Sequence, residues 1–150
     1  MHEKIYKGLQ IFLPLILGSI VGLLINSSMD YANLNQPPLS PPGIVFPIAW
    51  SILYLLMGIG YYLYRKNYKD NKTIVLYYLN LFFNLTWTFI FFVFKLRGLS
   101  ILWIIILIGI VLLLIKEFWQ TKRASAYCFI PYLLWLIFAT YLNIGIFILN

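Results

Sequence analysis

The chain has 150 residues, of which 63% are hydrophobic and only 10% are charged, and its net charge is +7. A soluble domain usually has about 25% charged residues, so this chain cannot cover a globular surface with polar side chains. Its basic residues lie in short clusters between apolar runs, which argues against nucleic-acid binding and indicates contact with membrane lipids.

Five apolar segments follow one another along the chain, at about residues 9–25, 44–64, 74–94, 99–115 and 124–149. Each approaches the roughly 20 apolar residues that a membrane span needs. In hydrocarbon every backbone amide must be paired internally, so each segment is predicted to be a helix. We therefore expect an all-α fold, an integral membrane bundle of five transmembrane helices that forms a single domain over residues 1–150.

The first segment resembles a signal peptide, because Lys4 and Lys7 precede an apolar run. The sequence after it, INSSMDYAN, lacks a small-x-small cleavage site, so we expect an uncleaved helix. Gly18 and Gly22 in this segment form a small-xxx-small pair of the kind that permits close helix contact.

The basic residues also predict the orientation. With five spans, nine of them fall on the amino-terminal side and only Lys95 and Arg97 fall on the other side. The positive-inside rule then places the amino terminus in the cytoplasm, and residues 27–43 and the carboxyl terminus outside. We expect the membrane to be the plasma membrane of a bacterial cell.

The connection between the first two helices contains the sequence PPLSPPGIVFPIAW, with five of the seven prolines. Proline locks φ and restricts the residue before it, so Pro41, Pro42 and their neighbours are predicted to form a stiff, preformed lid. Pro47 falls in the first turn of the second helix, where its missing N–H is not needed, and holds Trp50 one turn below the lid. The alternative is a rigid connector without a role in ligand binding.

Three predicted helices carry stripes of aromatic and polar residues that share one face. The stripes are Trp50, Tyr54 and Tyr61 in the second helix, Asn80, Asn84 and Trp87 in the third, and Trp135, Ala139 and Asn143 in the fifth, with Tyr132 nearby. Together they predict an internal cavity rimmed by aromatic rings. The alternative is hydrogen bonding between helices, which contributes about 0.6 kcal/mol per bond on average, or anchoring at the membrane interface.

In the fourth segment, the sequence ILWIIILIGIVLLLI (residues 101–115) has no polar side chain apart from the indole of Trp103, and we expect this helix to face lipid or another copy of the chain. No catalytic group of residues is visible, since all four acidic residues lie at or outside segment ends. An ion pump normally needs an ionisable residue inside the membrane, and none is predicted here. The single cysteine excludes a disulfide within the chain and a metal site of the usual cysteine spacings, and the single histidine, at position 2, excludes a buried histidine ligand to haem.

Three blocks of sequence resemble the tryptophan-rich sensory protein / translocator protein family (TspO/MBR), also called the peripheral-type benzodiazepine receptor family. They are QPPLSPPGIVFPIAWSILYLLMGIG, NLTWTFIFF and PYLLWLIFATYLN, and the resemblance extends from about residue 13 to residue 150. It implies a five-helix membrane protein, usually a homodimer, that binds porphyrins and in some cases sterols or synthetic benzodiazepines. The first loop is expected to close the ligand pocket.

The resemblance places Trp50, Asn84, Trp87, Trp135, Ala139 and Asn143 in that pocket. Helical spacing and the lid add further candidates, so that the full expected set is Tyr31, Pro41, Pro42, Trp50, Tyr54, Asn80, Asn84, Trp87, Trp135, Ala139 and Asn143. The chain departs from the family pattern at Leu39, where a tryptophan is common, at Asp30, where an aromatic residue is common, and at Trp103, where an acid is common. No basic residue follows Tyr141, so the family's sterol-contact pattern is incomplete.

The leading hypothesis is a receptor or sensor for a flat hydrophobic ligand, a protoporphyrin-type tetrapyrrole, with no covalently bound cofactor and no metal site. Lys95 and Arg97 are candidates to attract the ligand's carboxylates. The second hypothesis, implied by the resemblance, is an enzyme that degrades porphyrin with light and oxygen, with Trp50 and Trp135 as electron donors. The third is a carrier of porphyrin or lipid.

Overall fold

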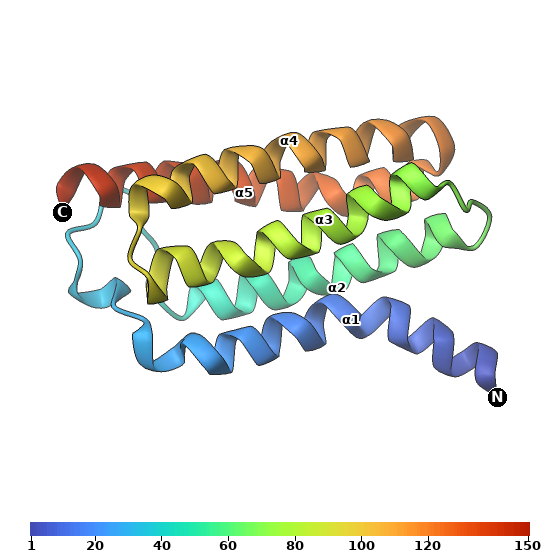
Figure 1. Cartoon of the computed structure of the whole chain (residues 1–150), viewed down its shortest axis with the longest axis horizontal. Helices are drawn as coiled ribbons and strands as arrows, with labels where there is room; N and C mark the ends of the chain where they lie inside the picture. The colour runs from blue at the N-terminus through green and yellow to red at the C-terminus, as the bar shows by residue number, and fades with distance from the viewer.

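The structure is a computed structural model that describes residues 1–150, and every regular element in it is helical. Five long helices form an up-and-down bundle: α1 (His2–Ile25), α2 (Val45–Arg65), α3 (Asn71–Thr88), α4 (Arg97–Thr121) and α5 (Arg123–Leu149) (Figure 1). All five are long and apolar enough to cross a membrane. The predicted all-α membrane bundle of five helices is therefore confirmed.

The helices extend beyond the apolar segments from which they were predicted. α1 begins at His2, about two turns before the predicted start at residue 9, and α4 covers Arg97–Thr121 where residues 99–115 were predicted. Lysine, glutamate and arginine are good helix formers, and their long side chains can reach the headgroups from a helix end. Hydrophobicity alone therefore underestimates the helix length.

The connections at the two ends of the bundle differ. The carboxyl terminus lies at the same end as the long connection between α1 and α2, which we call the loop end, and the amino terminus lies at the opposite or far end (Figure 1). The long connection contains two short 3₁₀ turns, η1 (Asn26–Ser28) and η2 (Tyr31–Asn33). Also at the loop end, α3 continues into a π-helical turn, η3 (Phe89–Val93), before the chain enters α4.

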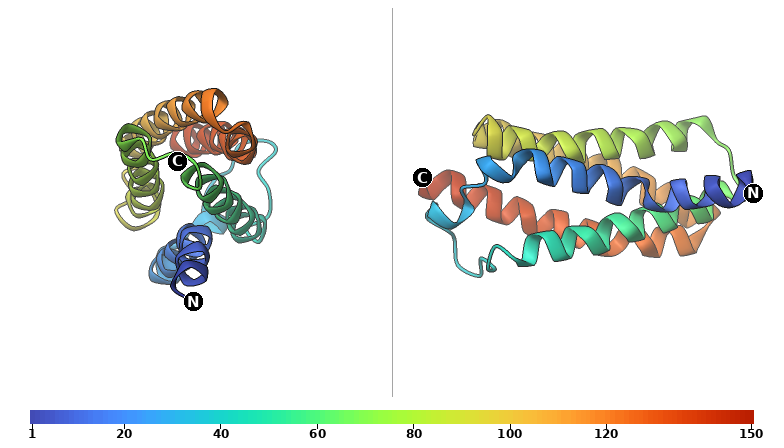
Figure 2. Two further views of the ribbon diagram at one scale, coloured as in Figure 1. Left: turned by 90° about the vertical axis from the view of Figure 1, so that its right-hand side faces the viewer. Right: turned by 90° about the horizontal axis from the view of Figure 1, so that it is seen from below.

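Helices α2 to α5 enclose the core, and α1 lies at the edge of the bundle, where it packs mainly on α2 (Figure 2). Only Pro14 and Ile25 of α1 are buried. Gly18 makes the close contact expected of the small-residue pair, because a Cβ there would collide with the ring of Tyr54, whereas Gly22 faces open space. Gly58 of α2 lies against the carbonyl of Ile11 in the same way.

The prediction that the fourth helix only faces lipid or another copy was wrong for one face of α4. Six of its residues are fully buried against neighbouring helices: Ser100, Ile104, Leu107, Val111, Leu114 and Phe118. They recur at spacings of three and four, as expected for one helix face. The sequence hides this face because the opposite, exposed face is equally apolar, as membrane-facing residues must be.

Candidate functional site

The bundle contains a cavity of about 780 Å³ at the loop end, between α1, α2, α5 and the end of α3. Its volume lies in the range of roughly 300–1,000 Å³ that is typical of small-molecule sites. Most of its lining is apolar, and the two ends of the connection between α1 and α2 form part of the wall through Met29, Tyr31, Ala32, Gly43 and Ile44. The cavity is therefore suited to a mainly hydrophobic ligand.

Aromatic rings from α2 and α5 form one continuous wall. The ring of Trp50 stacks on that of Tyr54, with centroids 5.4 Å apart, and meets Trp135 edge-on at 6.3 Å. Phe46 lies one turn before Trp50 and joins Trp135 to Tyr31, with centroid distances of 6.0 and 4.8 Å. Edge-on and offset contacts of this kind are the arrangements that aromatic quadrupoles favour, so the wall is preorganised.

A chain of hydrogen bonds lies behind this wall, inside the bundle. The Tyr54 hydroxyl donates to Asn84 Oδ1 at 2.6 Å, and the Asn84 amide donates to the Tyr132 hydroxyl at 2.8 Å. Tyr132 in turn donates to Asn80 Oδ1 at 2.7 Å, and the Asn80 amide contacts Met57 Sδ at 3.3 Å. The chain satisfies polar groups that would otherwise be stranded in hydrocarbon. It also turns the ring of Tyr54, and not its hydroxyl, toward the cavity.

A second set of hydrogen bonds joins α3, α4 and α5 beside the cavity. The indole N–H of Trp87 donates to Asn143 Oδ1 at 3.1 Å, and the hydroxyl of Ser100 lies 2.9 Å from the same oxygen. The Asn143 amide donates to the carbonyl of Arg97 at 3.2 Å. Trp87 and Asn143 both line the cavity, but these bonds direct their polar atoms toward the start of α4.

The indole N–H of Trp135 differs from the hydroxyl groups of the cavity. It is buried and has no acceptor within the chain. The hydroxyls of Ser19, Ser51 and Thr88 donate to carbonyls of their own helices at 2.6–2.7 Å, so they are already satisfied. The Trp135 N–H is thus a donor without a partner behind a largely apolar lining, and because the chain covers this atom, a ligand acceptor would reach it only after the surrounding side chains shift.

The sequence pattern of the TspO/MBR family matches residues 10–149. The chain belongs to the TspO/MBR family. It is 35% identical to a translocator protein homolog of Schizosaccharomyces pombe, over 91% of this chain and 87% of that protein. It is 32% identical to a tryptophan-rich sensory protein of Cereibacter sphaeroides (81% and 77%) and 33% identical to the human translocator protein (75% and 70%).

The predicted site residues of this TspO/MBR protein divide into three groups in the structure. Seven line the cavity: Tyr31, Trp50, Tyr54, Trp87, Trp135, Ala139 and Asn143. Asn80 and Asn84 lie in the hydrogen-bond chain behind Tyr54 and are not part of the lining. Pro41 and Pro42 lie in the connection above, where the Pro41 carbonyl accepts a 2.9 Å hydrogen bond from Tyr31. Partial burial raises the pKa of the Tyr31 phenol above its ordinary value. A role in ligand binding stays a prediction for all of them.

Sequence reasoning missed the part of the wall that α1 supplies, including Leu15, Gly18 and Gly22. These positions carry no polar or aromatic side chain that would have marked them. It also missed Phe46 and Ile146, which lie four residues before Trp50 and three after Asn143. The same helical spacing that identified Trp50 and Asn143 could have found these two.

Proposed function

We propose that this TspO/MBR protein is a membrane receptor for a flat hydrophobic ligand, a porphyrin in particular, bound in the cavity under the proline-rich connection. The observation that carries the proposal is the pairing of Trp50 and Trp135 in the wall of a cavity of about 780 Å³. A tetrapyrrole is an aromatic plate with polar edges. The indoles supply faces and edges against which the plate can pack.

A titration of the purified protein in the dark against a panel of porphyrins tests this proposal. Intrinsic fluorescence should fall saturably with one porphyrin per chain, because Trp50, Trp87 and Trp135 all line the cavity. A linear, unsaturable fall that persists in the Trp50→Phe/Trp135→Phe double variant would mean partitioning into detergent or lipid, and would refute the proposal.

A photochemical enzyme is the second candidate, and the contact between Trp50 and Trp135 favours it, because both indoles face the same space. In this reaction a light-excited porphyrin takes one electron from an indole and leaves an indole radical cation, dioxygen from solution oxidises the macrocycle, and repeated turnover requires a reductant from solution that returns one electron to the indole. Porphyrin decay under illumination is compared for wild type, each Trp→Phe variant and the double variant at matched occupancy. Equal decay in all four would eliminate this candidate, and more than one product per chain would establish turnover.

We also propose that the far end of the bundle faces the cytoplasm. The loop end has only Lys95 and Arg97 as basic residues, and the other nine lie toward the far end. With Cys128 replaced by alanine, Asn33→Cys should react with an impermeant thiol reagent applied to intact cells, and Asn71→Cys should not. The opposite pattern of labelling would reverse the orientation. Homodimer formation stays a prediction.

A further inference from the structure

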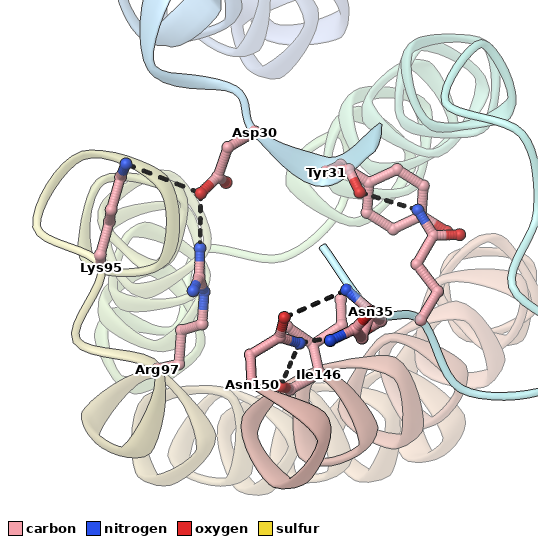
Figure 3. Close-up of polar contacts among 8 residues, drawn as sticks. Asp30, Tyr31, Asn35, Lys95, Arg97, Ile146 and Asn150 are labelled. Carbon is pink, nitrogen blue, oxygen red and sulfur yellow. Dashed lines mark hydrogen bonds and ion pairs between the residues drawn. The ribbon is translucent and has the colours of Figure 1, made fainter. Parts of the chain in front are cut away.

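The three charged side chains at the loop end form a single cluster. Arg97 donates to Asp30 Oδ2 at 2.7 Å, and the Lys95 ammonium lies 3.6 Å from the same oxygen (Figure 3). Asp30 belongs to the connection between α1 and α2, and Arg97 is the first residue of α4. The cluster therefore joins two segments that are 67 residues apart in the sequence. The basic pair, which the sequence suggested as a binding site for ligand carboxylates, thus already faces a carboxylate of the chain itself.

The pair between Asp30 and Arg97 is more than a solvated surface contact. The two side chains are only 22% and 15% exposed, and the Arg97 guanidinium lies over the ring of Phe91 at 5.4 Å. A cation in the first turn of a helix is disfavoured by the helix dipole, so Arg97 depends on a nearby carboxylate. Lys95 is 55% exposed and contributes less. Its backbone has a φ of 56°, in the left-handed region that a non-glycine residue adopts only when its surroundings impose it.

The cluster lies at the mouth of the cavity. Met29 and Tyr31, on either side of Asp30, both line the cavity, and so does Phe91 beneath Arg97. A movement of Asp30 away from Arg97 would therefore displace the cavity wall. The chain on this side is also weakly held, because none of residues 26–34 is buried. Segments with few buried contacts are those that open most readily.

The downstream half of the same connection is attached differently. The Asn35 backbone N–H donates to Asn150 Oδ1 at 3.0 Å, and the Asn150 amide donates back to the Asn35 carbonyl at 2.9 Å (Figure 3). The Tyr141 hydroxyl donates to the Pro38 carbonyl at 2.7 Å, and Gly145 leaves room for the ring of Pro37. Residues 35–38 are thus fastened to α5 by several contacts. In the upstream half, Tyr31 is hydrogen-bonded only to residues of the same connection, among them Gln36 and Pro41, so the side chain of Asp30 makes the hydrogen bond that ties this half to a helix.

We propose that the Asp30–Arg97 pair is a latch that controls access to the cavity. With the pair formed, residues 26–34 close the cavity on the α1 side. With the pair broken, residues 26–30 and the end of α1 move outward, while Tyr31, bonded to Gln36 and Pro41, stays with residues 35–38 on α5. The inference deepens the proposed function, since it concerns entry to the same cavity, but the movement itself can be measured without any ligand.

The test uses a cysteine inside the cavity as a reporter. Ala139 lines the cavity and is 6% exposed, so Ala139→Cys in a Cys128→Ala background should react slowly with a small maleimide. Asp30→Asn and Arg97→Gln should each raise the reaction rate about tenfold, the factor that corresponds to about 1.4 kcal/mol. The double variant Asp30→Arg/Arg97→Asp should return the rate close to its starting value, because the pair is restored with its charges exchanged.

Two controls separate opening from general damage. Glu117→Gln breaks the Lys72–Glu117 pair, 3.1 Å long, at the far end of the bundle and should leave the rate unchanged. Leu136→Cys, at a fully buried position of the core, should stay unreactive in every variant. Unchanged labelling at residue 139 in both single variants would overturn the latch, and so would equal acceleration at residue 136 or a charge exchange that fails to slow the reaction.

Porphyrin kinetics then link the latch to the proposed function. Protoporphyrin should associate and dissociate several-fold faster in Asp30→Asn, with a much smaller change in its dissociation constant. If protoporphyrin does not bind at all, the proposed function fails while the labelling result still decides the latch. If it binds with unaltered rates in Asp30→Asn, the latch fails as a gate while the binding function stands.

Discussion

The two ends of the bundle use the same helices and the same kinds of residue for opposite purposes. At the far end the aromatic rings fill the core. The rings of Tyr61 and Tyr77 stack with their centroids 3.7 Å apart, and the ring centroid of Phe118 lies 5.2 Å from those of both Tyr64 and Phe129. At the loop end, Trp50, Trp135 and Trp87 line open space instead of filling it. An aromatic stripe on a membrane helix therefore predicts a buried face, but does not tell a packed core from a binding cavity.

The sizes of the residues between the rings account for part of the difference. Along its buried face, α5 carries Phe129, Tyr132 and Leu136 in the packed region and then Ala139 beside the cavity. Gly22 of α1 and Gly43 of the connection also face the cavity, whereas the space beside Gly18 is filled by the ring of Tyr54. Small residues opposite large rings leave volume that only a ligand or solvent can occupy, whereas large residues on facing helices fill it.

The largest loss of stability is expected from truncating a large side chain in the packed core at the far end. Phe118 is fully buried, so Phe118→Ala should lower the free energy of unfolding by about 3–5 kcal/mol through lost burial and a new void. The porphyrin affinity of the folded protein should not change. Reversible unfolding in mixed detergent micelles measures the loss. Phe147→Ala, at a 52% exposed position on α5, is the control, and an equal loss there would contradict the comparison.

The second-largest loss of stability is expected when the hydrogen-bond chain between the two regions is broken. Asn84→Leu removes the partner of both Tyr54 and Tyr132 and should lower the free energy of unfolding by about 1–2 kcal/mol, within the range for stranding a buried polar group. Tyr132→Phe should show strong non-additivity with Asn84→Leu in a double-mutant cycle, because the two share one chain. Simple addition of the two losses would mean that the chain does not act as a unit.

A smaller effect, but the one that most directly distinguishes the two ends, comes from adding bulk. Ala139→Phe should weaken porphyrin binding about tenfold, or about 1.4 kcal/mol, and leave unfolding nearly unchanged, because the ring enters the cavity. Ala126→Phe is the matched control at the packed end, where Ala126 is fully buried. Overpacking there should cost about 1–3 kcal/mol of stability without affecting affinity. If Ala139→Phe lowers stability and spares affinity, position 139 belongs to a packed seam.

The smallest effect is expected from changing one indole in the cavity wall. Trp50→Phe or Trp135→Phe keeps an aromatic ring but loses the larger face and the N–H, so each should weaken dark porphyrin binding by about 1 kcal/mol. Trp119→Phe, at a 43% exposed position near the far end, should have no effect. The measurement is the same dark titration, and a Trp119→Phe effect as large as the other two would place the porphyrin outside the cavity.

The amino-acid sequence by itself determined the elements and their chemistry. Runs of apolar residues can satisfy their backbone in a membrane only as helices, which is why five spans could be predicted. Helical spacing is a local property, so it also placed Trp50, Trp135 and Ala139 on inward faces correctly. The density of prolines predicted an irregular, stiff connection, and the order of three motifs pointed to the family that the comparisons then showed.

Only the tertiary structure decided which of those inward groups remain free. Asn84 and Asn143 share their faces with Trp87 and Trp135, but each amide is bonded to partners 30 to 56 residues away, whereas the Trp135 N–H has none. The sequence suggested Arg97 as a site for ligand carboxylates, but in the structure its guanidinium is paired with Asp30. The buried face of α4 and the part of the cavity wall that α1 supplies could not be predicted from the sequence either. The spacing of residues along one helix determines which side chains point in the same direction. Contacts between helices depend on how segments distant in the sequence pack together, and no local sequence pattern encodes that packing.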